Sequence, residues 1–180
     1  MNIKRGFTLI ELLVVIAILA ILATITVVVL NPAELLRQAR DSTRISEMGS
    51  LRSAIALYLA SQNTGLNNAT LQCTAGPCTG GTSSTNVTVG GSGWVTVNFT
   101  AIPGGSPLAT LPVDPVNSAA LWYSYAASST TNVFEFNAQM ESIRYSAGGS
   151  DDVEANTADG GNGANCYEIG TTLTLIGTAC

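Results

Sequence analysis

The sequence has no histidine and few charged residues, and these absences exclude several classes of function. Without His the chain cannot form a serine–histidine triad or a His-containing metal site. Seven residues are Lys or Arg against twelve Asp or Glu, so the net charge is −5 and no basic surface exists for nucleic-acid phosphates. We therefore expect a non-enzymatic protein that does not bind nucleic acid. A length of 180 residues suits one modest domain and one additional element.

The apolar residues are concentrated near the N-terminus. Between Phe7 and Leu30, 20 of 24 residues are apolar, and no charge occurs over the 22 residues Leu12–Ala33. A helix of this length, at about 1.5 Å per residue, matches a hydrocarbon core of about 30 Å. The segment is therefore long enough to span a membrane.

Two common kinds of N-terminal segment fit this run only in part. A cleaved secretory signal would use Lys4 and Arg5 as its basic region, but the apolar run is too long, and the first A-x-A triplet lies far beyond it at Ala54–Ala56. A simple uncleaved anchor is the other alternative. Both leave Glu11 unexplained, because a carboxylate in an apolar run is costly in lipid and indicates a functional group with a partner.

The residues around Glu11 carry a specific pattern. The segment Lys4–Leu13 reads KRGFTLIELL and resembles the class III signal of type IV pilins and of the pseudopilins of type II secretion. In that family a membrane peptidase cuts after the glycine on the cytoplasmic side and methylates the new N-terminal Phe. The resemblance implies cleavage and methylation at Gly6 and Phe7, with Glu11 as the fifth residue of the processed chain.

Glu11 is then expected to act in assembly. Cleavage would leave an α-ammonium on Phe7, four residues before Glu11. When apolar helices bundle, Glu11 must be neutralised or paired, and a neighbour's Phe7 ammonium is the natural counter-ion. Such a pair would fix the axial register of subunits, which apolar packing alone would not. The alternative is that Glu11 only reaches the headgroups.

A second helical segment follows the apolar run. Pro32 disfavours the helical conformation of Asn31, so we expect a kink there rather than the end of the helix. An amphipathic pattern then continues to about Gln62. Its apolar positions are Ile45, Met48, Leu51, Ile55 and Leu59.

The polar side of this helix carries charges at helical spacing. Arg37 and Asp41 are four residues apart, and Arg44 and Glu47 are three apart. We expect these charges to face water or another subunit.

The predicted fold is α+β, with the long N-terminal helix packed on a small antiparallel sheet, as in pilins. The predicted strands are Trp94–Phe99, Leu121–Ala126, Val133–Ala138 and Tyr167–Ile176, with a hairpin loop at Ala127–Thr131. The expected segments are a cleaved leader (1–6), a transmembrane and filament-core helix (7–31), an amphipathic helix (32–62), a variable Gly/Ser/Thr-rich loop (63–92), and a β-sheet head with an acidic C-terminal loop (93–180).

Leu111–Pro115 reads LPVDP and precedes an aromatic stretch, which resembles a segment of major pseudopilins. The Trp-Gly that usually follows in that family is replaced here by Val116 and Asn117. Physically the segment is a rigid turn in which Asp114 can cap nearby amides.

The loop 148–162 is rich in carboxylates and glycine. Oxygen-rich flexible loops suit Ca²⁺, and major pseudopilins commonly bind calcium in C-terminal loops, although the spacing is not that of an EF-hand. A solvated acidic loop is the alternative, and a hydrolase site at the adjacent carboxylates would be poorly pre-organised. The candidate calcium ligands are Asp151, Asp152, Glu154 and Asp159.

Four cysteines lie beyond the apolar run, which fits an extracytoplasmic domain with disulfides. Three connectivities exist, of which we favour Cys73 with Cys78 and Cys166 with Cys180. A four-thiolate zinc site is the competing interpretation, but these spacings lack paired short knuckles.

Together these features predict a filament subunit anchored in the cytoplasmic (inner) membrane, with its N-terminus inside, and later extracted into a helical homopolymer. The resemblance implies a prepilin peptidase, an assembly ATPase, a platform protein and related minor pilins as partners. It leaves open whether the filament is an adhesive or motility pilus or a secretion pseudopilus. The competing class is a monomeric membrane-anchored binding module.

Overall fold

A computed structural model describes residues 6–62, 64–67 and 69–177. The chain divides into two units, Met1–Leu36 and Arg37–Cys180. The first contains the apolar helix, and the second contains a helix packed on a sheet. The architecture is α+β, as predicted.

The N-terminal helical region is interrupted at one residue. Helix α1 spans Leu9–Leu30, and α2 spans Pro32–Ser61. Between them Asn31 adopts the left-handed conformation (φ 39°), because a following proline disfavours the right-handed helical region. The Asn31 carbonyl accepts hydrogen bonds from the amides of Glu34 and Leu35, so α2 begins with proline at its first position.

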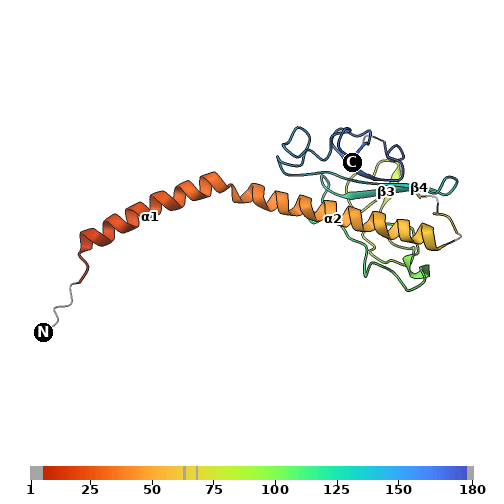
Figure 1. The fold of residues 1–180 in the computed structure, drawn as a ribbon, viewed down its shortest axis with the longest axis horizontal. Coiled ribbons are helices and arrows are strands. Elements are labelled where there is room, and N and C mark those ends of the chain that lie inside the picture. The colour runs from red at the N-terminus through yellow and green to blue at the C-terminus, as the bar shows by residue number, and fades with distance from the viewer. Residues whose placement is uncertain (1–5, 63, 68, 178–180) are drawn as a thin grey trace. The chain divides into compact units, whose positions relative to one another are not determined.

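The head is built on the apolar face of α2, which lies along β3 and β4 in Figure 1. Met48, Leu51 and Ile55 of α2 are fully buried, as their spacing predicts. The core also contains tilted and edge-on aromatic pairs, including Trp94–Phe136 and Tyr125–Phe136. Burial of this one face therefore holds helix and sheet together.

The sheet has five strands in the order β2-β1-β3-β4-β5. The strands are β1 (Ala69–Cys73), β2 (Gly81–Ser83), β3 (Tyr123–Ser128), β4 (Val133–Ala138) and β5 (Tyr167–Gly170). All neighbours are antiparallel except β1 and β2, which are parallel. The prediction of a purely antiparallel sheet was therefore wrong at this edge. Short β-rich runs do not reveal strand direction.

Two strands lie in the segment predicted as a loop. β1 and β2 fall within residues 63–92, where Thr, Gly and Ser obscure the strand pattern. The disulfide between Cys73 and Cys78 joins the end of β1 to the turn before β2. This covalent link helps a weakly patterned segment to pair at the edge of the sheet.

The predicted strand Trp94–Phe99 is wrong. This run has one isolated bridge, between Gly90 and Asn98, and ends in a 3₁₀ turn at Phe99–Ala101. Successive residues Trp94 and Val95 are both fully buried, whereas neighbours in a strand point to opposite faces. The run is an irregular segment whose bulky side chains fill the core.

The remaining strand predictions agree better with the structure. β4 has the predicted bounds, and β3 is shifted two residues toward the C-terminus. Asn132 takes the left-handed conformation (φ 53°) in the turn between them. β5 is shorter than predicted, because it ends at Gly170. The amide of the next residue, Thr171, donates to the Phe134 carbonyl outside the regular ladder.

Candidate functional site

The residues of the N-terminal motif form the start of α1. Thr8 is the N-cap, and its Oγ1 accepts a hydrogen bond from the Glu11 amide at 3.3 Å. The Glu11 carboxylate in turn accepts bonds from the Thr8 amide and hydroxyl, each at 2.8 Å. Glu11 therefore completes a capping box that fixes where the helix begins. Lys4 and Arg5 lie outside the described residues.

The rest of α1 is apolar on every side. None of its residues is buried in the single chain, and Phe7 is 89% exposed just before it. This helical region is long and apolar enough to cross a membrane. A helix that is apolar all round needs lipid or other helices around it, so this surface is the main candidate for membrane insertion and assembly.

The charged residues of α2 do not all face water, which corrects the prediction. Asp41 and Arg44 are fully buried, and they form an ion pair of 2.7 Å between Arg44 Nη1 and Asp41 Oδ1. Arg44 also binds Asp114 through two bonds, Nε–Oδ2 at 2.6 Å and Nη2–Oδ1 at 2.9 Å. Its Nη1 is 2.7 Å from Glu141 Oε1. The guanidinium thus links α2 to two distant loops.

The carboxylates around Arg44 have further donors. Asp41 accepts the amides of Glu141 and Ser142, and Glu141 accepts two bonds from Arg40, at 2.8 and 2.7 Å. Hydrogen bonding from Arg40, strengthened by Arg44, lowers the pKa of Glu141 to about 2. Buried charges that are paired and hydrogen-bonded in this way hold a fixed geometry. We call Arg40, Asp41, Arg44, Asp114 and Glu141 the Arg44 cluster.

Asp114 caps backbone amides, as expected, and also binds Arg44. Its Oδ1 accepts the amides of Val116 and Asn117, at 2.8 and 3.0 Å, so it closes the predicted turn. The bidentate bond to Arg44 could not be foreseen from the local sequence. The core-facing position of Asp41 and Arg44 could have been predicted from their spacing. With Met48 and Leu51 they recur every three or four residues, so all four lie on the core-facing side of the helix.

The other predicted ion pair of α2 also has a different partner. Glu47 accepts a 2.5 Å hydrogen bond from the hydroxyl of Tyr123 on β3. Burial raises the pKa of Glu47, and burial with this bond raises the pKa of Tyr123. The side chain is therefore a second polar link between helix and sheet.

The four candidate calcium ligands are not gathered around one point. Asp151 pairs with Arg144, Asp152 accepts the amides of Gly148 and Glu154, and Asp159 accepts those of Gly161 and Glu168. Glu154 is 2% exposed and accepts the amides of Met140 and Ala147. Among the described residues no group of three or more acidic or cysteine side chains could hold a metal ion. Each carboxylate instead has its own ion-pair or hydrogen-bond partners.

The disulfide between Cys73 and Cys78 has the predicted pairing. The other predicted pair, Cys166 with Cys180, includes a residue outside the described part of the chain. Its connectivity stays a prediction.

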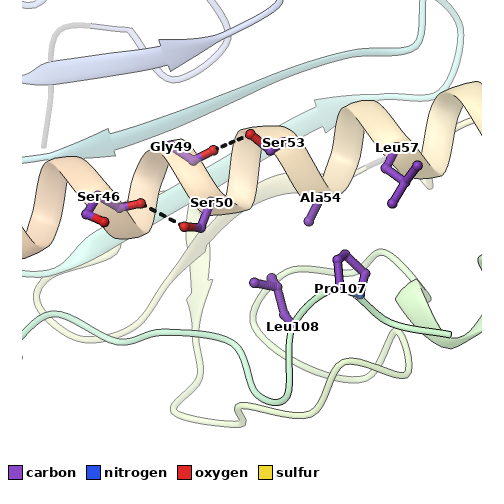
Figure 2. A pocket seen from close by; sticks show the side chains of 8 residues that line it. All are labelled: Ser46, Gly49, Ser50, Ser53, Ala54, Leu57, Pro107 and Leu108. Atoms are coloured by element: carbon purple, nitrogen blue, oxygen red, sulfur yellow. Dashed lines mark hydrogen bonds between the residues drawn. The ribbon is translucent and has the colours of Figure 1, made fainter.

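A groove of about 590 Å³ lies beside α2 (Figure 2). One wall is the small-residue side of the helix, where the Ser50 and Ser53 hydroxyls donate to backbone carbonyls one turn earlier. The other wall is Pro107 and Leu108. No residue that lines the groove is charged. The serine hydroxyls are engaged by the helix itself, so the groove offers no activated nucleophile.

Sequence reasoning missed two buried acids, Glu135 on β4 and Glu168 on β5. Phe134 and Phe136 pack in the core with α2, so strand alternation places Glu135 and Glu168 on the opposite face of the sheet. The only signal was their place within strand-like runs, where a charge at a buried position is unusual.

These features define a class of protein: a small α+β head on a chain whose N-terminal helix is apolar on all sides. Residues 1–27 match the family model described as the prokaryotic N-terminal methylation motif, the signal of type IV pilins and pseudopilins. Searches of curated proteins and of solved structures gave no significant match. The motif and the exposed helix together fit a membrane-anchored protein of the pilin or pseudopilin type.

Proposed function

We propose that the chain is a structural subunit of a type IV pilus-like filament. The observation that carries this proposal is the methylation motif over residues 1–27, which runs into a 22-residue apolar helix with no buried residue. Prepilin peptidase would cut between Gly6 and Phe7. The helix would first reside in the cytoplasmic membrane with its N-terminus inside, and would then join a bundle of like helices in the filament core.

Assembly would need the partners that such filaments use. These are further copies of the chain, minor pilins, an assembly ATPase and a platform protein. The chain itself would catalyse no reaction. The segment boundaries predicted from the sequence, with a leader of 1–6 and a core helix of 7–31, belong to this proposal.

Glu11 would pair with the Phe7 ammonium of a neighbouring subunit. In the single chain its carboxylate already bonds to Thr8, so helix capping and subunit pairing must be separated experimentally. Glu11→Gln keeps a side chain that suits the capping box but removes the charge. We expect this variant to be processed normally and to form few filaments, as seen by electron microscopy. Normal filaments with unchanged register would show that the charge pair is not used.

Processing itself is tested by the intact mass of the membrane-purified protein. The expected mass is that of a chain that begins at methylated Phe7. In a Gly6→Val variant we expect the full-length mass, and this change does not strain the fold because a Cβ at Gly6 meets no atom within 4 Å. A wild-type protein that still starts at Met1 would contradict the proposal and favour a monomeric membrane-anchored module.

The second candidate is a major pseudopilin of a type II secretion system, which the LPVDP turn at Leu111–Pro115 favours. Deletion of the gene distinguishes the two. Loss of an exported enzyme from the medium, with surface pili unchanged, would identify a pseudopilin. Loss of surface filaments, with secretion intact, would identify a pilin.

A further inference from the structure

The sheet face away from α2 carries a buried polar group of three side chains. Glu135 and Asn137 lie two residues apart on β4, and Glu168 of β5 is paired with Asn137 in the strand register. Because side chains alternate along a strand, all three point to the same face. Glu135 and Asn137 are fully buried, and Glu168 is 2% exposed.

Glu168 is surrounded by donors. Its Oε2 accepts the amides of Asn162 and Gly163, at 2.6 and 3.2 Å. Its Oε1 accepts a bond of 3.3 Å from Asn137 Nδ2. Burial raises the pKa of Glu168, and the N–H donors act in the opposite direction because they favour the ionised form.

Glu135 differs because only one of its oxygens has donors. Oε2 accepts the amides of Leu175 and Ile176, at 2.6 and 3.1 Å, which fastens the C-terminal segment to the sheet. Oε1 is buried without a hydrogen-bond partner, and so is Asn137 Oδ1. The Glu135 carboxyl interacts with the side chains of Asn137 and Glu168. Glu135 Oε1 and Asn137 Oδ1 are thus two buried acceptors, on side chains of the same sheet face, that have no hydrogen-bond donor.

In the described part of the chain, no Lys or Arg side chain forms an ion pair with Glu135 or Glu168. The leading electrostatic influences on the two acids come from other acids, because Glu135 and Glu168 act on each other and Asp159 acts on Glu168. Beyond Ser53 the sequence has a single basic residue, Arg144, which is bound to Asp151. Two ionised carboxylates in this dry site would repel each other with no counter-charge.

We propose that Glu135 in the folded head is a neutral carboxylic acid whose Oε1–H donates to Asn137 Oδ1. Asn137 then links the acid to the carboxylate of Glu168, because its Nδ2 already donates there. One proton satisfies both orphaned oxygens. A hard cation fits less well, because it takes six to eight oxygen ligands and the Glu168 oxygens are already engaged by N–H donors.

The proton makes the attachment of the C-terminal segment depend on pH. Burial raises the pKa of Glu135 in the folded state. The stabilisation is therefore fully present below the pKa of an unfolded Glu, about 4.3, and is lost as the pH rises through the folded pKa. Ionisation would place a second charge beside Glu168 and weaken the hold on Leu175 and Ile176. This device lies in the head and does not depend on whether the chain forms filaments.

The test uses the full chain in detergent micelles, with thermal unfolding followed by tryptophan fluorescence, since Trp94 is fully buried. We expect the melting temperature of the wild type to fall as the pH is raised from 5 to 8. Glu47, Glu154 and Glu168 also have pKa values raised by burial and contribute to this fall. Glu135→Gln, whose amide N–H₂ replaces the acidic proton, should show a smaller fall than the wild type. Asp151→Asn is the matched control, because it neutralises a half-exposed carboxylate that pairs with Arg144, and it should keep the wild-type slope.

Infrared difference spectra provide a second readout that does not require unfolding. In the difference spectrum between the wild type and Glu135→Gln at pH 5, we expect the C=O stretching band of one protonated carboxyl group. Equal pH slopes in the two proteins, together with no such band, would overturn the proposal. A melting temperature that rises with added Ca²⁺ in the wild type but not in Glu135→Gln would also overturn it, in favour of a bound cation.

Discussion

At the residue scale, Arg44 forms three ion pairs, more than any other charged side chain in the described part of the head. It is fully buried and binds Asp41, Asp114 and Glu141. Burial alone would lower the pKa of Arg44, but the bonds to its partners raise it, so the group stays charged. Removing it would leave buried carboxylates without a counter-charge.

We predict that Arg44→Ala lowers the free energy of unfolding by about 3–5 kcal/mol, the usual cost of breaking a buried ion pair. The measurement is urea unfolding monitored by tryptophan fluorescence. Arg144→Ala is the matched control, because Arg144 and Asp151 are about half exposed and such pairs contribute about 0–1 kcal/mol. Equal losses in the two variants would refute a central role for the Arg44 cluster.

Glu141 gives the head a second pH dependence, of opposite sign to that of Glu135. Because the folded pKa of Glu141 is about 2, its stabilisation is present above the unfolded pKa of about 4.3 and is lost as the pH falls toward 2. We predict that Glu141→Gln flattens the loss of stability between pH 5 and pH 2. Asp151→Asn should leave that acid limb as in the wild type. An unchanged acid limb in Glu141→Gln would exclude this assignment.

At the element scale, α2 combines a buried face that holds the head with an outer side of small residues. Its core positions were predicted because apolar residues recur at helical spacing. The burial of its charged residues was not predicted, because the sequence does not show which loops will cover Asp41 and Arg44. Trp94–Phe99 was misassigned for a similar reason, since β-forming residues also anchor irregular segments when the core needs their volume.

Gly49 gives a stability prediction for this element. It lies inside α2, where glycine costs roughly 0.5–1 kcal/mol relative to alanine, and an added Cβ meets no atom within 4 Å. We predict that Gly49→Ala raises the free energy of unfolding by that amount. Gly65→Ala is the contrasting variant, because its Cβ would displace the Asn132 side chain that accepts the Leu66 amide. A loss of stability in Gly49→Ala would show that the helix needs glycine there.

At the scale of the whole molecule, charge is distributed very unevenly. The stretch Leu12–Ala33 has none, while the chain beyond Ser53 has eight carboxylates and one arginine. Most of these carboxylates cap backbone amides or pair with arginine, so the acidity of the head is largely used to fix loops.

This arrangement leads to a prediction about calcium. Asp151, Asp152, Glu154 and Asp159 are each engaged by their own donors, so we expect a chelator to leave the melting temperature unchanged. A ligand bound only by the folded state must raise the melting temperature. A drop on chelation that calcium reverses would restore the calcium hypothesis. Asp152→Asn should then abolish the response.

The sequence by itself determined the N-terminal apolar helix of this protein and the motif at its start. An apolar helix and its capping signal depend on neighbours a few residues apart, so Gly6, Phe7 and Glu11 could be placed in a motif without any tertiary information. The tertiary structure decided which polar residues are buried. Arg44 meets Asp114 across 70 residues, and Glu168 meets Asn137 across 31. Such pairs depend on how distant segments are brought together, which local spacing does not encode.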